Sequence, residues 1–577
     1  MRPPRIQEGR ANIALGLGRG EDDKRMEKRL LLAFVLSAAI LLAWSVLFPP
    51  PQRQQPTPPD AAGPRATPEA TAPVAGLPSG ADEGGDVAEA IVESDELVGA
   101  TIEETVEFAN AKIAVVLTNR GAAVSSYRLL GYDDDDGQPL DLIQTVPLSE
   151  SSRPLQLITA DGPDNALYEV ERIDGAVFFR WADGAGSSVS KRVALSESGY
   201  GLDVAITATG TRAGSPISIG TGMRDLGETE RNSRLALWGE GVTLADGEIT
   251  RFKRRKVEER RVLSAGALSF AGFEDAYFLN VLRPDGGVSE VRIDPLEFTL
   301  DEEAQRVLQI SVVPSQGQLR GELLGAPKEY DLLQSINQGV EKTLTFGWFL
   351  TPIAVFFLKA LRWIYGFVGN WGVAIILLTL GIRIVLFPLM HTSTVSMRKM
   401  AKVQPKVKEI QAKHKKKKSD PQARAKMNQE MMALYKQEGV NPMAGCLPLL
   451  VQMPLLFALY QLFLKAIELR HAPFIWWITD LSAKDPLYVT PVLMTATMWL
   501  QQRLAPQAGD PQQQRLMRMM PLIFGIMFLQ FPSGLVLYWL ANNVITIIQQ
   551  EITLHIVGER KRGGGGAKKK ARKDGKA

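Results

Sequence analysis

A single arginine inside a long apolar run is the residue of this chain whose position most needs a chemical explanation. The run extends from Asn370 to Pro388 and contains Arg383, with Thr379 one helical turn earlier on the same face. About 20 helical residues cross the ~30 Å hydrocarbon core of a bilayer. In a span from about 371 to 390, Arg383 would lie only ~4 Å from the centre, where a charge costs at least ~2.5–3.5 kcal/mol. Such a residue is expected to face a protein interior or a wet cavity, and the alternative is an arginine that snorkels to the interface.

Groups suited to catalysis or to metal binding are scarce. The 577 residues include four histidines and one cysteine, Cys446, which falls at the start of an apolar segment. A small buried side chain is a better interpretation of this cysteine than a reactive thiol. We find no nucleophile paired with a base, no set of metal ligands and no credible phosphate loop, so we expect no enzyme activity, no metal and no cofactor.

The chain has two unlike parts, although 45% hydrophobic residues and a net charge of +3 suggest an ordinary soluble protein. Residues 1–29 are basic, and 30–48 form an apolar segment long enough for an uncleaved membrane anchor. Residues 49–100 are a linker rich in Pro, Ala and Gly. Because Met26 also begins a charged flank for the anchor, the sequence leaves open whether translation starts at Met1 or at Met26.

Residues 101–345 show short runs in which apolar side chains alternate with other residues. Leu202, Val204 and Ile206 follow this pattern, and Asp174-Gly175 is a strong hairpin signal. The pattern predicts a many-stranded antiparallel β-sandwich. The domain has no cysteine, so its stability must come from a buried core. Its acidic side chains leave open a sugar-binding cleft, although an ordinary solvated surface is the simpler interpretation.

The remaining residues predict a helical membrane domain. Residues 346–369 form an amphipathic helix that we expect to lie in the membrane interface, with Lys359 and Arg362 on one face. Residues 370–557 contain five further spans, so the chain is predicted to be a polytopic α-helical membrane protein with six transmembrane helices. Phe531-Pro-Ser-Gly534 divides the last double-length run by a tight turn.

Basic residues predict the orientation of these spans. The connection 392–440 predicts a helical hairpin with a lysine-rich tip, and 558–577 form a basic tail. The positive-inside rule places both in the cytoplasm together with the N-terminus, and 49–369 in the periplasm. These cations form either a solvated face or a docking surface for anionic lipid or ribosomal RNA. At the hairpin tip and in the tail they are Lys415, Lys416, Lys417, Lys418, Lys568, Lys569, Lys570, Arg572 and Lys573.

Three motifs in the helical part resemble the YidC/Oxa/Alb family of membrane protein insertases, in the Gram-negative form with a large periplasmic domain. They are Asn370-Trp-Gly with Gly381-Ile-Arg383 and Phe387-Pro388, the segment from Asn441 to Pro454, and Phe531-Pro-Ser-Gly-Leu-Val-Leu-Tyr538. The resemblance covers essentially the whole chain. The sequence departs from the family pattern at Trp539, where relatives often have a second tyrosine.

The resemblance implies an insertase bundle of five helices around a hydrophilic groove that is open to the cytoplasm and to lipid. The groove residues expected from it and from the polar centre of the last span are Arg383, Thr379, Gln452, Tyr538, Trp539, Asn542 and Asn543. Substrate helices are expected to slide along Cys446, Met453 and Pro454. The implied partners are nascent membrane proteins, the Sec translocon, the ribosome and anionic lipids, and the implied location is the bacterial inner membrane.

Moving a polar flank through such a groove requires no nucleotide. A groove that reaches partway shortens the dry path, and burial of the substrate's apolar helix in lipid favours the inserted state. Two other classes compete with this interpretation. A small-solute transporter would also place polar residues at mid-membrane, but we find no paired repeats. An anchored envelope protein with a sugar-binding sandwich would leave Arg383 without a role.

Overall fold

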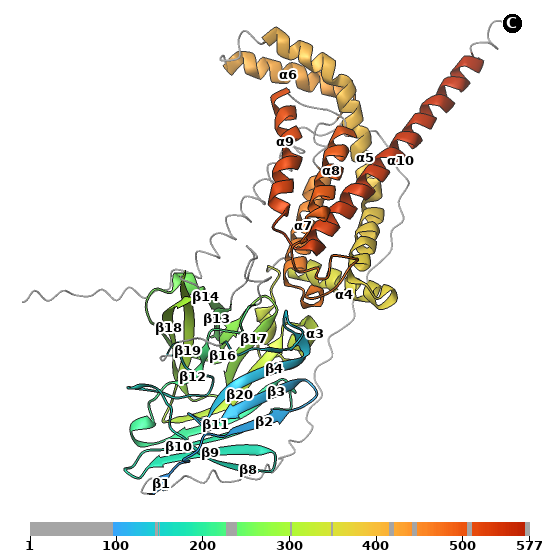
Figure 1. Ribbon diagram of the computed structural model, residues 1–577. Helices are drawn as coiled ribbons and strands as arrows, with labels where there is room; N and C mark the ends of the chain where they lie inside the picture. Colours follow the sequence, from blue (N-terminus) through green and yellow to red (C-terminus); the bar gives the residue numbers. More distant parts are fainter. Residues whose placement is uncertain are drawn as a thin grey trace, which may run out of the picture. The chain divides into compact units, whose positions relative to one another are not determined.

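The computed structural model describes residues 96–144, 148, 151–226, 239–300, 303–347, 350–414, 421–440, 447–504 and 511–571. The predicted basic N-terminus, the anchor and most of the linker lie outside the described residues. The same is true of Lys415, Lys416, Lys417, Lys418, Cys446, Arg572 and Lys573. Along the described chain a β region is followed by a helical region (Figure 1).

The β region, as described, consists of short antiparallel strands. They are β1 (Leu97–Val98), β2 (Thr105–Ala109), β3 (Ile113–Thr118), β4 (Ala123–Asp133), β5 (Pro139–Asp141), β6 (Ile158–Thr159), β7 (Gly162–Pro163), β8 (Glu169–Ile173), β9 (Ala176–Asp183), β10 (Ser188–Leu195), β11 (Gly201–Ala208), β12 (Ile217–Thr221), β13 (Glu240–Ala245), β14 (Glu248–Phe252), β15 (Arg261–Ser264), β16 (Leu268–Glu274), β17 (Phe278–Pro284), β18 (Val288–Leu300), β19 (Glu303–Pro314) and β20 (Gln318–Pro327).

These strands form one large sheet and smaller sheets around a shared core. The large sheet has the order β1-β9-β10-β11-β20-β17-β16-β13-β14, with β8 also paired to β9. Two four-stranded sheets have the orders β12-β19-β18-β15 and β2-β3-β4-β5, and β6 pairs with β7. Tyr127, Phe179 and Ile310 come from the three larger sheets and are fully buried in one hydrophobic cluster. An antiparallel, sheet-rich domain with a common core is therefore confirmed.

Local signals in the β region have the predicted consequences. Asp174 and Gly175 have φ values of 50° and 78° and join β8 to β9, as the hairpin signal predicted. In β11, Leu202, Val204 and Ile206 are buried and the residues between them are half-buried. Burial in β3 is almost continuous instead, because this strand lies between β2 and β4 in its sheet and is covered on both faces.

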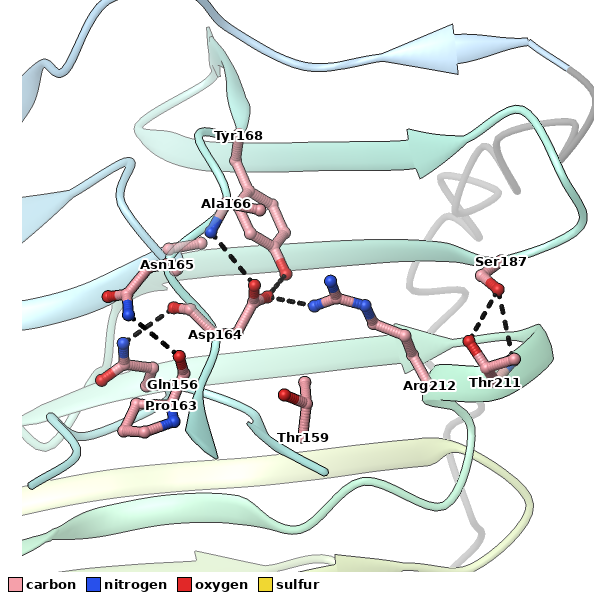
Figure 2. A network of polar contacts seen from close by, with 12 residues as sticks. Gln156, Thr159, Pro163, Asp164, Asn165, Ala166, Tyr168, Ser187, Thr211 and Arg212 are labelled. Atoms are coloured by element: carbon pink, nitrogen blue, oxygen red, sulfur yellow. Dashed lines mark hydrogen bonds and ion pairs between the residues drawn. The ribbon is translucent and has the colours of Figure 1, made fainter. Parts of the chain in front are cut away.

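A buried polar network occupies part of the β region (Figure 2). The Asp164 carboxylate accepts a hydrogen bond of 2.6 Å from the hydroxyl of Tyr168 and forms an ion pair of 2.5 Å with Arg212. Burial alone raises the pKa of Asp164, but the bonds from Arg212 and Tyr168 outweigh burial and hold the pKa below its usual value. Sequence analysis did not predict this network, since Arg212 is far along the chain from Asp164 and Tyr168.

The helical region begins with α3 (Tyr330–Ile336) and continues through longer helices. These are α4 (Thr351–Val368), α5 (Trp371–His414), α6 (Pro421–Gln437), α7 (Leu447–Lys465), α8 (Val489–Leu504), α9 (Pro511–Phe528) and α10 (Ser533–Ala571). α10 packs beside α5, α7 and α8, and α8 packs beside α9 (Figure 1). α6 begins at Pro421 and is followed by the left-handed Gly439, and the predicted turn at Phe531-Pro-Ser-Gly534 separates α9 from α10.

Two helices are longer than the sequence suggested. The apolar run and the first arm of the hairpin are one helix, because α5 continues through Pro388 and Pro405. In the turn that follows the first proline, Thr392 Oγ1 donates to the carbonyls of Pro388 and Leu389 at 3.1 and 2.9 Å. α10 likewise runs on to Ala571, so residues 558–571 of the predicted basic tail are helical, and no proline interrupts them.

Two of the described helices, α4 and α5, are long and apolar enough to cross a membrane. Leu450–Lys465 and Arg518–Phe528 are shorter apolar helical segments. The predicted total of six spans therefore stays a prediction. So does the interfacial position of α4, whose exposed face carries Phe356, Trp363 and Phe367. On α4, Arg362 Nε donates to Glu468 at 2.8 Å.

Candidate functional site

The apolar interface between α5 and α10 contains a buried arginine. Arg383 of α5 is only 4% exposed, and its Nε donates to Oδ1 of Asn542 on α10 at 2.8 Å. Its Nη2 donates to the same oxygen. A planar guanidinium that presents two donors to one amide oxygen fixes the rotation of both helices at this level. The structure thus brings two of the predicted groove residues into direct contact.

The backbone of Arg383 is also bonded to α10. Gln549 Nε2 donates to the Arg383 carbonyl at 3.0 Å. Pro388 lacks an N–H and disturbs the hydrogen bonds of the preceding turn of α5, so an additional donor from a neighbouring helix is favourable there. One turn after Pro388 on α5, His391 Nδ1 lies 3.2 Å from Oγ1 of Thr553. We call the contacts of Arg383 and His391 with Asn542, Gln549 and Thr553 the α5–α10 seam.

Sequence reasoning missed three members of the seam, namely Gln549, His391 and Thr553. A signal for two of them was present. Asn542, Thr546, Gln549 and Thr553 recur at helical spacing and form one polar stripe along the helix, in a run that also contains Asn543, Gln550 and Glu551. Thr546 bonds within its own helix, to the carbonyl of Asn542 at 2.6 Å. His391 had no pattern of its own, and only its contact with α10 identifies it.

Two other predicted groove residues lie next to the seam. Thr379 is 1% exposed, and its hydroxyl donates to the Ile375 carbonyl of its own helix at 2.7 Å. Tyr538 is buried one turn before Asn542 on α10 and is close enough to Arg383 to interact with it electrostatically. Its ring centroid lies 5.7 Å from that of Phe463 on α7. Thr379 and Tyr538 thus line the same level of the bundle as Arg383.

The neighbouring residues of α10 point to other helices. Trp539 packs against Phe524 and Phe528 of α9, with ring centroids 6.4 and 5.0 Å away. Asn543 is 2% exposed, and its Nδ2 lies 3.4 Å from the Met494 carbonyl and from Thr497 Oγ1 of α8. Consecutive residues of a helix are about 100° apart, so Asn542 and Asn543 cannot face the same neighbour. The structure therefore divides the predicted groove residues between two faces of α10.

The predicted residues on α7 have no recorded contact with the seam. Gln452, Met453 and Pro454 are half-buried on the second turn of this helix. Within the described contacts, none joins Gln452 to Arg383. Their place in a shared groove with Arg383 stays a prediction.

The charge of Arg383 is not neutralised by a neighbour in the described part of the chain. Asn542 is a neutral acceptor, and no carboxylate forms an ion pair with Arg383 among the described residues. Within the same residues, no group of three His, Cys, Asp or Glu side chains could hold a metal ion. What the seam offers is a fixed positive charge in an apolar bundle, with hydrogen-bonding groups beside it.

A helical bundle with a buried, unpaired arginine and an attached antiparallel β domain defines a membrane protein that handles polar groups within the bilayer. The comparisons with known proteins agree. The family model described as "60Kd inner membrane protein" matches residues 363–560, and that described as "YidC periplasmic domain" matches residues 105–361.

Three relatives share the name "Membrane protein insertase YidC". The one from Geobacter sulfurreducens is 40% identical over 377 residues, 64% of this chain and 69% of the relative. The one from Geotalea daltonii is 34% identical over 544 residues, 91% of this chain and 98% of the relative. The one from Nitratidesulfovibrio vulgaris is 35% identical over 567 residues, with the same two shares of 91% and 98%.

The chain belongs to the YidC family of membrane protein insertases. Membership confirms the resemblance inferred from the three motifs and identifies a bacterial inner membrane protein with a periplasmic domain. It also confirms that the chain is an insertase and not an enzyme, and it favours this function over the transporter and the sugar-binding protein.

Proposed function

We propose that this insertase receives the polar flank of a nascent membrane protein at Arg383. The observation that carries the proposal is that Arg383 is buried and bonded to a neutral amide, with no described carboxylate as its partner. Its positive charge is therefore available to an acidic or polar group that enters the bundle. At contact distance in a partly wet site, the attraction amounts to about 1–4 kcal/mol.

The other predicted site residues have supporting roles in this proposal. Thr379, Tyr538 and Asn542 line the level of Arg383, and we propose that Gln452, Trp539 and Asn543 extend a hydrophilic groove to the neighbouring helices. Cys446, Met453 and Pro454 contact the substrate's apolar helix as it slides into lipid. Methionine suits this role because its flexible side chain adapts to unlike partners. Burial of the apolar helix supplies the free energy of insertion.

The topology that fits this function has six spans with both termini in the cytoplasm. Residues 30–48 are the first span, 49–369 are periplasmic, 346–369 lie at the interface, and 370–557 form the five-helix core. The exposed Phe356, Trp363 and Phe367 of α4 support its contact with lipid, because aromatic side chains favour the interface. The hairpin 392–440 is cytoplasmic by its charge.

Partners on the cytoplasmic side are proposed from charge. Lys415, Lys416, Lys417 and Lys418, with Lys568, Lys569, Lys570, Arg572 and Lys573, contact ribosomal RNA or anionic lipid. In this proposal the chain acts on nascent membrane proteins alone or beside the Sec translocon.

The test uses pairs of small inner membrane proteins that differ only in the charge of the translocated flank. We expect Arg383→Ala to reduce insertion of the acidic-flank protein about fivefold more than that of the neutral-flank protein, since ~1 kcal/mol corresponds to that factor. Arg383→Lys keeps the charge and should preserve much of the activity. Insertion is measured as protease accessibility of the flank in depleted cells that express each variant at equal abundance.

Ile384→Ala is the matched control, because Ile384 is the next residue of α5, about 100° around the helix from Arg383, and is 64% exposed. It should leave both proteins unaffected. If Arg383→Ala reduced insertion of the acidic-flank and neutral-flank proteins equally, the arginine would only fix helices or hydrate the bundle. The family assignment would still stand.

A further inference from the structure

A second charged surface lies in the β region, between β14 and β15. It contains Lys253, Arg254, Arg255, Lys256, Arg260 and Arg261, with Glu258 and Glu259 as the only carboxylates in that stretch of sequence. We call residues 253–261 the basic connection. Its centre is the 3-10 helix η2 (Arg254–Lys256). Nothing in the proposed insertion step uses it.

Several cations of the basic connection have no internal counterion. Arg260 pairs with Asp294, and Lys253 lies 3.9 Å from Glu240. Arg255, Lys256 and Arg261 are exposed, and the structure records no ion pair for them within the described residues. The pKa of Arg254 is lowered, first by burial and then by the neighbouring charge of Arg255. Like charges held this close repel each other, so an external anion would stabilise the surface.

Two contacts join β14 and the turn before it to the segment that leads into α4. Arg251 Nη2, two residues before Lys253, donates to the Thr343 carbonyl at 3.1 Å. Lys342 Nζ donates to the Gly247 carbonyl, also at 3.1 Å. The chain from Thr343 to the start of α4 at Thr351 reaches at most ~30 Å even when fully extended. Thr343, which Arg251 contacts just before the basic connection, is therefore tethered within about 30 Å of the start of α4.

We propose that the basic connection binds the anionic phospholipid headgroups of the leaflet that faces the β region. The proposal rests on the membrane placement of α4 in the proposed function. Exposed lysine and arginine side chains are attracted to anionic lipid within about a Debye length, ~8–10 Å at moderate salt. An acidic protein would fit the charge as well, but lipid is the anionic partner that the tether keeps within reach.

The test measures the reactivity of Lys256 in the full chain. The protein is placed in lipid nanodiscs of phosphatidylcholine alone or of phosphatidylcholine and phosphatidylglycerol in equal parts, and lysines are modified with an amine-reactive ester and quantified by mass spectrometry. We expect modification of Lys256 to be at least about threefold slower in the anionic discs at low salt, and equal in both discs at high salt. Lys112, an exposed lysine elsewhere in the β region, is the internal reference.

Two double variants distinguish an effect of the basic connection itself from an effect of the net charge of the protein. Arg255→Gln with Arg261→Gln should abolish the protection of Lys256 in anionic discs. Arg153→Gln with Arg172→Gln removes the same charge from exposed positions on other elements and should retain the protection. All four positions are exposed, so folding should be unaffected, and the unchanged reactivity of Lys112 checks this.

Three outcomes would overturn the proposal. The first is equal reactivity of Lys256 in both kinds of disc at low salt. The second is protection in zwitterionic discs that salt does not remove, which would assign the surface to a protein contact. The third is equal loss of protection in the two double variants. Because lysine reactivity is measured without a substrate, its result is distinguishable from a failure of Arg383 in the insertion assay.

Discussion

Two arginines in this chain, the half-buried Arg212 and the buried Arg383, differ in how their charge is balanced. Arg212 of the β region pairs with Asp164 at 2.5 Å, so that site carries no net charge. Arg383 of the bundle bonds the neutral amide of Asn542 and keeps its charge. A buried ion pair is a means of holding structure together, whereas an unpaired buried cation is costly and is retained for a purpose. This contrast supports a substrate role for Arg383 and a structural role for Arg212.

Lys191 is also a buried cation, and backbone carbonyls accept hydrogen bonds from its charged group. It is fully buried, and its Nζ donates to the carbonyls of Gly121, Ala122 and Leu155 at 2.6, 3.1 and 2.7 Å. All three acceptor residues have positive φ values, of 68°, 45° and 69°, which turn their carbonyls toward one point. Burial lowers the pKa of Lys191 to about 7, although the nearby Asp164 carboxylate opposes this shift.

The lowered pKa of Lys191 predicts a stability that depends on pH. An unfolded lysine keeps its proton up to pH ~10.4, whereas the folded state releases it above about pH 7. Between these values the unfolded chain binds more protons, so the free energy of unfolding should rise with pH, by at most ~1.4 kcal/mol per pH unit. We expect hydrogen-exchange protection of β10, corrected for intrinsic rates, to increase from pH 7 to 9 in the detergent-solubilised chain.

Lys191→Met should remove this slope, although it also lowers stability at every pH because three carbonyls lose their donor. Lys112→Met, an exposed change, should keep the slope. If Lys191→Met and the unchanged protein showed the same dependence on pH, another group would be responsible.

At the scale of elements, local sequence signals predicted well where helices begin and end. They predicted poorly whether a helix continues through a proline. Pro421 begins α6 and Gly439 follows it, because a first-turn proline and a left-handed glycine act within one turn. We expected a span that ends near residue 390 and a separate hairpin arm after it, yet α5 continues through Pro388 and Pro405. The cost of a proline in a helix is reduced where neighbouring groups bond the freed carbonyls. Gln549 of α10, for example, bonds the Arg383 carbonyl in the turn before Pro388, a contact that the sequence around the proline does not reveal.

From the lysines at the tip of the hairpin 392–440 we predict a salt-dependent contact with the ribosome. Replacing Lys415, Lys416, Lys417 and Lys418 by Gln should weaken co-sedimentation of the detergent-solubilised chain with ribosomes. It should also reduce the slope of log affinity against log salt, because each lost phosphate contact lowers that slope by about 0.7–0.9. A variant with Lys112, Arg153, Arg172 and Arg261 changed to Gln removes the same charge from the β region and should bind as before. Binding that is unchanged across the salt titration would leave the hairpin tip as a solvated surface.

At the scale of the whole molecule, the candidate site could be predicted only in part. Arg383, Thr379 and Asn542 were predicted and lie at one level of the bundle, because a polar residue in an apolar span must face the interior. Which helix each residue of α10 faces could not be predicted, since rotation about the helix axis is fixed by packing. Asn543 and Trp539 therefore turned out to contact α8 and α9.

The seam and all proposed groove residues follow residue 370, so the β region should be separable from insertion. Deleting 101–320 would cut through β20 and leave an unpaired strand end, whereas deleting 101–327 removes that strand completely. We expect the chain that lacks 101–327 to support growth of a strain depleted of its own insertase. Its insertion of a neutral-flank protein should be within about twofold of that by the full chain. The same deletion with Arg383→Ala is the control and should show the flank-dependent loss of the full-length variant. Failure of insertion with the shortened chain abundant and protease-resistant in the membrane would mean that the β region takes part in the step itself.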